Sequence, residues 1–204
     1  MNRGRPREFD KTEALEKATL LFWRNGYRGV SLDDLTTALG VNKPSLYAAF
    51  GDKESLFLQV VDHYRSKLTG PLYTELLAAP KLADGLAAFL RGLGKAVTSK
   101  DHPGCLIACV LTQEAVDSET MRAKLQDTIA AADEGFTNLM REHESELRPV
   151  ITPEDAAKFL TSAIHGMSVR ARSGASAKEL EPIGAFVIKA ICKTTLRRQA
   201  PRLQ

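Results

Sequence analysis

The 204-residue chain lacks several features that would place it in other classes of protein. Its three cysteines are an odd number, which argues against the paired disulfide framework of a small secreted protein. No uninterrupted apolar run approaches membrane-spanning length, and the first residues lack the apolar segment of a signal peptide. These absences favour a cytoplasmic protein with no membrane partner.

Catalytic and cofactor-binding motifs are also missing. The chain has no glycine-rich phosphate loop, no metalloprotease motif and no nucleophile elbow. We therefore expect no catalytic residues, no cofactor and no metal. A thiol-dependent enzyme built on Cys105 and His102 is an alternative, although the two residues are too close in sequence to be assigned as a catalytic dyad.

The composition is that of a globular protein with a mild excess of positive charge. Apolar residues make up 44% of the chain, and the net charge is +3. Positive charge is concentrated at the extreme N-terminus, where Gly4 and Pro6 disfavour a helix and Arg3, Arg5 and Arg7 alternate with other residues. Such an extended arm can place arginines in a DNA minor groove; a solvated terminus without a fixed structure is the alternative.

Residues 31–53 have the pattern of two short helices joined by a tight turn. Ser31 can cap the first helix, Gly40 supplies a left-handed residue at its end, and Asn42 can cap the second helix. The helical period turns one set of apolar side chains inward, namely Leu32, Leu35, Leu39, Leu46 and Phe50. A helix-turn-helix, in which the second helix enters the DNA major groove, fits this pattern; an ordinary helical hairpin is the alternative.

The rest of the chain also shows helical rather than strand periodicity, so we expect an all-α fold of about nine helices and no sheet. A longer amphipathic helix begins near Lys53 and is broken or kinked at Gly70-Pro71. This helix is suited to link two domains. We expect a DNA-binding domain in residues 1–53, which includes the basic arm, and a second, helical-bundle domain in residues 54–204.

Taken together, these features resemble the TetR family of bacterial transcription regulators. The resemblance covers the first third of the chain densely. It is carried by Arg-Gly-Arg-Pro-Arg at residues 3–7, Ala18, Leu21-Phe22, Gly26-Tyr27, Ser31, Asp34-Leu35, Leu39-Gly40-Val41, Ser45-Leu46-Tyr47, Phe50, Lys53-Glu54 and Leu56. It implies a repressor whose variable helical domain binds a small molecule and forms a homodimer.

The resemblance also implies which residues meet double-stranded DNA. Thr36 departs from the family, in which a small alanine is usual at the helix crossing, and Ala49 often has a longer counterpart. Two recognition helices related by a dyad would read a palindromic operator. The implied DNA-binding residues beyond the arm are Tyr27, Ser31, Lys43, Pro44, Ser45, Tyr47 and Lys53.

The last helix carries an apolar surface that is too wide for a one-sided surface helix. Its apolar side chains are Ile183, Phe186, Val187, Ile188 and Ile191. We expect the last two helices to form the dimer interface, as the resemblance also suggests; a central position of the last helix in its own subunit is the alternative.

Residues 102–106 read His-Pro-Gly-Cys-Leu, and a second cysteine follows at position 109. We expect Cys105 in the first turn of a helix, where the helix N-terminus lowers a thiol pKa. The Pro-Gly-Cys-Leu pattern resembles a TetR subgroup, so Cys105 is a candidate sensor of electrophiles or oxidants. A buried apolar role is the alternative, and a metal site with His102 and Cys109 lacks a fourth ligand.

The resemblance further implies a small, largely apolar effector inside the helical bundle. Each candidate lining residue fits an ordinary core position equally well. These candidates, besides Cys105, are Phe89, Leu93, Val110, Phe136, Met140, Phe159 and His165. The sequence thus favours a DNA-binding repressor released by a small molecule, and the alternatives are a helical protein-interaction scaffold or the thiol-dependent enzyme.

Overall fold

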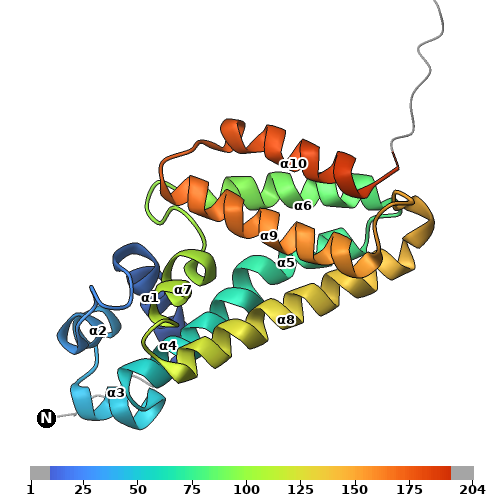
Figure 1. Ribbon diagram of the computed structural model, residues 1–204. Helices are drawn as coiled ribbons and strands as arrows, with labels where there is room; N and C mark the ends of the chain where they lie inside the picture. Colours follow the sequence, from blue (N-terminus) through green and yellow to red (C-terminus); the bar gives the residue numbers. More distant parts are fainter. Residues whose placement is uncertain (1–9, 194–204) are drawn as a thin grey trace, which may run out of the picture.

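A computed structural model describes residues 10–193, and these residues form the all-α fold that the sequence predicts (Figure 1). The predicted arginine arm lies outside the described residues. Between residues 10 and 193 no strand is present, and the only β-type pairing is an isolated bridge between Leu147 and Cys192. The helices are α1 (Lys11–Asn25), α2 (Leu32–Leu39), α3 (Lys43–Phe50), α4 (Lys53–Tyr64), α5 (Gly70–Leu77), α6 (Leu82–Val97), α7 (Thr112–Glu114), α8 (Glu119–Glu142), α9 (Pro153–Arg172) and α10 (Ala177–Ile191).

Local capping fixes the ends of the N-terminal helices as the sequence predicts. Ser31 and Asp34 form a reciprocal capping box at the start of α2. Gly40 ends α2 in the left-handed conformation, with φ of 69°. The side chains of Asn42 and Asp52 cap α3 and α4 by accepting from the backbone N–H groups three residues later.

Two short π-helical segments interrupt the regular helices. The segment η1 (Arg65–Thr69) joins α4 to α5, and η2 (Ile107–Leu111) leads into α7. The predicted break at Gly70-Pro71 is therefore a change of helix type followed by the start of α5 rather than a loop. Such π-helical turns often mark functional sites, because the extra residue widens the helix locally.

Two hydrophobic cores lie at opposite ends of the molecule. The first contains α1 to α4, and it also includes Leu106, Ile107, Val110 and Met121 from the later part of the chain. The second is built from α5, α6, α8, α9 and α10. In Figure 1, α2 and α3 lie at one end, α10 at the other, and the long α8 runs between the two ends. The buried side chains of α4 belong to the first core, so α4 packs with the helix-turn-helix, although all but its first residue lie after residue 53.

None of the described helices has both the length and the apolar character needed to cross a membrane.

Candidate nucleic-acid interface and effector cavity

The helix α3 has an anchored inner face and a solvent-exposed outer face. Leu46 and Phe50 are 1% and 3% exposed, and they fix the helix against α2 and α4. Tyr47 is 46% exposed, and the predicted DNA-contacting residues Lys43, Pro44 and Ser45 are exposed with it. Rigid support under exposed polar groups is what a groove-reading helix needs.

Lys43 is already engaged in an ion pair on this surface. Its ammonium group lies 2.7 Å from a carboxylate oxygen of Asp33, and this contact raises the pKa of Lys43. Both side chains are largely exposed, so the pair contributes little stability. An acceptor group on DNA can therefore replace Asp33 at little energetic cost.

Lys53 and Tyr27 form a second prearranged group beside α3. The Lys53 ammonium lies 4.2 Å from the centroid of the Tyr27 ring, which packs on Phe22 and Phe57. Burial lowers the pKa of Lys53. Ser31 is exposed, but its hydroxyl takes part in the α2 capping box with Asp34. These contacts hold the predicted DNA-contacting residues Tyr27, Ser31 and Lys53 in fixed positions.

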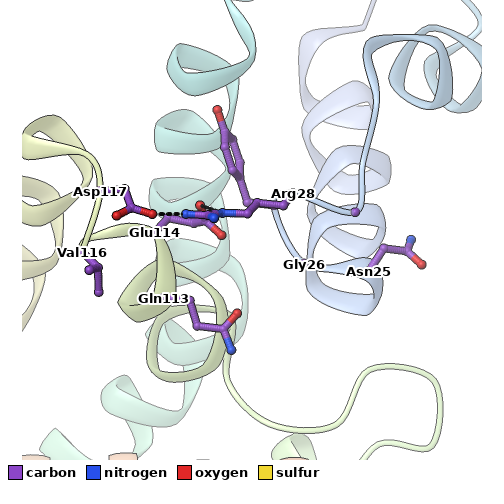
Figure 2. Close-up of a pocket in the computed structure, with 9 residues that line it drawn as sticks. Asn25, Gly26, Arg28, Gln113, Glu114, Val116 and Asp117 are labelled. Carbon is purple, nitrogen blue, oxygen red and sulfur yellow. Dashed lines mark hydrogen bonds and ion pairs between the residues drawn. The ribbon is translucent and has the colours of Figure 1, made fainter.

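Arg28 joins the helix-turn-helix region to α7, a contact that the sequence did not indicate (Figure 2). The guanidinium Nε lies 3.0 Å from an oxygen of Glu114, and Nη2 forms an ion pair with Asp117. Glu114 is only 7% exposed, and its carboxylate forms its ion pair with Arg28. Glu54 of α4 adds a second link by accepting a hydrogen bond from the Ser118 hydroxyl. We refer to Arg28, Glu114 and Asp117 as the Arg28 latch.

Replacing Arg28 with glutamine is expected to lower the free energy of unfolding, because the buried Glu114 carboxylate loses its ion-pair partner. Urea denaturation measures this loss. The matched control is the double variant Arg28→Gln/Glu114→Gln, which leaves no unpaired buried charge, since Asp117 is exposed, and should recover most of the stability. A double variant as unstable as the single one contradicts the role assigned to the latch.

Trp23 forms a further junction between the two cores. Its indole N–H donates to the backbone oxygen of Gly104 at 3.0 Å, and its ring packs edge-on against Tyr64 and His102. Arg172, at the end of α9, donates to the backbone oxygen of Trp23 at 3.0 Å. Trp23 is 1% exposed and contacts both parts, so it is buried at their junction.

A cavity of about 490 Å³ lies between η1, α5, α6, η2, α8 and α9. This volume is in the range of small-molecule sites. Of the candidate lining residues from the sequence, the cavity brings together Phe89, Leu93, Cys105, Phe136 and His165. Burial lowers the pKa of His165, while the charge of Asp133 opposes this shift.

The other three candidates lie elsewhere. Val110 packs in the first core and Met140 in the second. Phe159 is 43% exposed on the surface of α9. These three residues are as apolar as the phenylalanines and leucine that do line the cavity. The difference is the side of the helix on which each side chain lies. Sequence reasoning missed several residues that line the cavity, among them Arg65, Tyr73, Thr128 and Thr161.

The environment of Cys105 differs from the sequence-based expectation. Cys105 precedes the helical turn that starts at Leu106, and it is buried. Burial raises its pKa, while a hydrogen bond with Tyr64 and backbone N–H groups only partly oppose this. The expected lowering of the pKa was therefore wrong, because burial outweighs the helix terminus. Within residues 10–193, no group of three histidine, cysteine or acidic side chains could hold a metal ion.

The raised pKa predicts slow labelling of Cys105 by a maleimide in the native protein. A thiol whose pKa is raised holds less thiolate at neutral pH, and thiolate is the reacting form. Labelling should therefore be slow at pH 7 and accelerate as the pH rises, whereas the unfolded protein should label rapidly. Peptide mass spectrometry identifies the modified residue. Fast native labelling of Cys105 at pH 7 would support the sensor hypothesis instead.

The apolar residues of α10 divide between two environments. Val187 and Ile191 are 2% and 0% exposed and pack into the core of their own subunit, while Ile183 is half-buried. Phe186 is 72% exposed. On α9, Phe159 and Val169 are also exposed. The exposed apolar surface of this end of the molecule is thus shared by α9 and α10.

Comparison with known proteins supports the fold. Residues 14–60 match the family model described as bacterial regulatory proteins, tetR family. The chain is 34% identical to the HTH-type transcriptional repressor ComR of Escherichia coli K12, over 92% of this chain and 91% of ComR. It is 31% identical to the repressor BdcR of the same organism, over 95% of this chain and 94% of BdcR.

A solved structure shows a similar arrangement of helices. It is a cysteine mutant of the TetR family transcriptional regulator CifR in complex with 26-bp double-strand operator DNA. The TM-score is 0.82 at 32% sequence identity, and the match covers 92% of this chain and all of the CifR chain. With a helix-turn-helix at its N-terminus, a helical bundle behind it and repressors among its relatives, the chain belongs to the TetR family of bacterial transcriptional regulators.

Proposed function

We propose that this protein is a transcriptional repressor whose homodimer binds a palindromic operator and releases it when a small molecule fills the cavity. The observation that carries the proposal is α3, whose inner face is locked while Lys43, Ser45 and Tyr47 stay exposed. The relatives ComR and BdcR are named as repressors, and CifR has been solved on operator DNA.

Residues 1–53 form the DNA-binding part of this proposal, and residues 54–204 form the ligand-binding and dimerisation part. Lys43, Ser45 and Tyr47 would read bases, with Pro44 beside them, while Lys53, Tyr27 and Ser31 would meet the phosphate backbone. The arm arginines Arg3, Arg5 and Arg7 would add contacts in the minor groove. A regulator of this kind acts in the bacterial cytoplasm, where the chromosome lies.

The dimer interface in this proposal is the exposed surface of α9 and α10. Phe159, Gly166 and Val169 recur at helical spacing on the exposed side of α9, and Phe186 is the exposed aromatic residue of α10. Small residues between large apolar ones allow two helices to approach closely. A two-fold axis through this surface would place two α3 helices for half-sites about 34 Å apart or a multiple of that spacing.

The cavity provides a route from effector to DNA. Its wall includes η1, which continues directly from α4, and α4 packs in the core of the helix-turn-helix. An effector that prefers a different tilt of α4 would change the distance between the two recognition helices. A second route from the cavity to the helix-turn-helix runs through η2 and α7. The segment η2 lines the cavity, and Glu114 of α7 pairs with Arg28.

A scaffold or a thiol-dependent enzyme fits the structure less well. A protein-interaction scaffold leaves unexplained why Lys43 and Tyr47 are exposed on an anchored helix. An enzyme based on Cys105 needs an accessible thiolate, but burial raises the pKa of this thiol. We therefore assign no catalytic activity to the chain.

Selection of bound fragments from random duplex DNA tests the proposal. We expect a palindromic consensus, and sedimentation of the complex should show a dimer or a pair of dimers on each duplex. Affinity should fall steeply with salt, because phosphate contacts release counterions. A monomer that recovers no consensus at moderate salt would refute the repressor assignment.

A further inference from the structure

Two buried threonine hydroxyls on the cavity wall have no hydrogen-bond partner. Thr128 on α8 and Thr161 on α9 are 6% and 5% exposed, and both line the cavity. Neither Oγ1 atom makes a hydrogen bond among the described residues. Buried hydroxyls are normally paired, so each of these needs a specific explanation.

Other helical threonines of this chain show what the usual solution is. The hydroxyls of Thr19, Thr69 and Thr98 donate to the backbone oxygen four residues earlier, at 2.7 to 2.8 Å. Thr19 is as deeply buried as the cavity threonines, at 3% exposure. Burial in a helix therefore does not by itself leave a threonine without a partner, and the two exceptions share one cavity.

The residues of α8 and α9 that line the cavity next to the two threonines are uncharged. The carboxylate of Asp133 on α8 acts electrostatically on His165, but Asp133 does not line the cavity. His165 lies one turn after Thr161 on α9, and burial favours its neutral form by lowering its pKa. Ala132 and Gly135 follow Thr128 on α8. The charged residues at the cavity are Asp62, which pairs with Lys124 at 2.6 Å, and the partly exposed Arg65 on η1. A charged ligand group beside Thr128 and Thr161 would lose its hydration without gaining a counter-charge.

The remaining wall is mainly apolar and aromatic, and the hydroxyls of Ser66 and Thr69 on it donate to backbone oxygens. Phe136 packs edge-on against Phe89 and Tyr73, with ring centroids 5.8 and 5.7 Å apart. Leu72, Leu93 and Ile164 complete this surface. Such a wall accommodates an aromatic or branched aliphatic body.

We propose that the effector is an uncharged, mainly apolar molecule with a hydrogen-bonding oxygen, such as a ketone, and that Thr128 and Thr161 recognise this oxygen. This inference rests on the proposed repressor function in one respect, namely that it calls the bound molecule the effector. Binding restores partners to both hydroxyls, which the cavity walls do not offer. The apolar wall holds the body of the molecule, and the partly exposed Arg65 on η1 stays hydrated.

The first test needs no ligand. Replacement of either cavity threonine with valine removes the unpaired hydroxyl at nearly constant volume, so thermal unfolding of Thr128→Val and Thr161→Val should occur about 2–4 °C higher. The matched control is Thr19→Val, which deletes a paired hydroxyl and should lower the unfolding temperature. If the cavity variants lose as much stability as Thr19→Val, the hydroxyls have partners in solution and the inference fails.

The second test compares ligands with a common skeleton: 2-ethylnaphthalene, 2-acetylnaphthalene and 2-naphthoate. Calorimetric titration of the free dimer should show that the ketone binds about tenfold more tightly than the hydrocarbon, as expected for hydrogen bonds made on binding. The carboxylate should bind more weakly than the ketone. In Thr128→Val/Thr161→Val the ketone should lose its advantage over the hydrocarbon.

Other results overturn the inference. Tightest binding by 2-naphthoate points to an acid held by Arg65, and equal or absent binding of ketone and hydrocarbon shows that the hydroxyls recognise nothing on this skeleton. DNA release is measured separately on the selected operator. Ketone binding without any operator binding refutes the repressor function alone, whereas operator binding without a ketone preference refutes this inference alone.

Discussion

The double variant Lys43→Ala/Tyr47→Ala is expected to bind operator DNA at least about a hundredfold more weakly than the native protein. Each side chain that touches DNA contributes about 1–3 kcal/mol, and a dimer of this variant lacks both side chains in each half-site. Tyr47 is 46% exposed, and Lys43 makes only the exposed pair with Asp33. The unfolding temperature should therefore stay unchanged. Fluorescence anisotropy with a labelled operator measures the affinity.

A matched control separates this effect from a general loss of positive charge. Lys95→Ala removes an exposed lysine from α6, far along the chain from α3, and should leave the affinity nearly unchanged. In the double variant, the slope of log affinity against log salt should become shallower by about 0.9 for each phosphate that is no longer neutralised. If the double variant binds as tightly as the native protein, α3 is not the reading helix.

The variant Gly104→Ala is expected to lose about 3 kcal/mol of unfolding free energy. Gly104 has φ of +84°, and an added Cβ would lie 2.8 Å from the Cys109 sulfur and 3.1 Å from the Cβ of Arg172. Its backbone oxygen also accepts the Trp23 indole N–H. The substitution thus combines backbone strain with a clash at the junction of the two cores. Urea denaturation followed by far-UV circular dichroism measures the loss.

Gly174→Ala is the matched control for the backbone alone. Gly174 also has a positive φ, +104°, but no atom lies within 4 Å of an added Cβ. We expect this variant to lose about 1 kcal/mol, which is the cost of backbone strain without a clash. Equal losses for the two variants would show that the packing around Gly104 is not tight.

Local interactions explain why the sequence predicted the helix-turn-helix well. The Ser31–Asp34 capping box, Gly40 and Asn42 act within three or four residues of chain, so their effect can be seen before the fold is known. The helical period likewise predicts that Leu46 faces inward and Tyr47 outward. These local signals predicted the helix-turn-helix, and the resemblance to the TetR family then indicated its function in a DNA-binding repressor.

Long-range packing decided the rest. Arg28 meets Glu114 across 86 positions of sequence, and no local pattern marks that pair. The helical period identified apolar faces, but it did not separate Phe136 at the cavity from Met140 in the core. For Cys105, a helix terminus favours the thiolate, whereas burial favours the thiol by raising its pKa, and the outcome depends on what packs over the side chain.

The sequence by itself therefore determined the N-terminal helices, their ends and the exposed face of α3, because caps, turns and periodicity are short-range effects. Only the tertiary structure decided where the cavity lies, which side chains it leaves without partners and how the two cores are joined. Those features depend on how helices distant in the sequence fill space against one another, and each helix alone is compatible with several such arrangements.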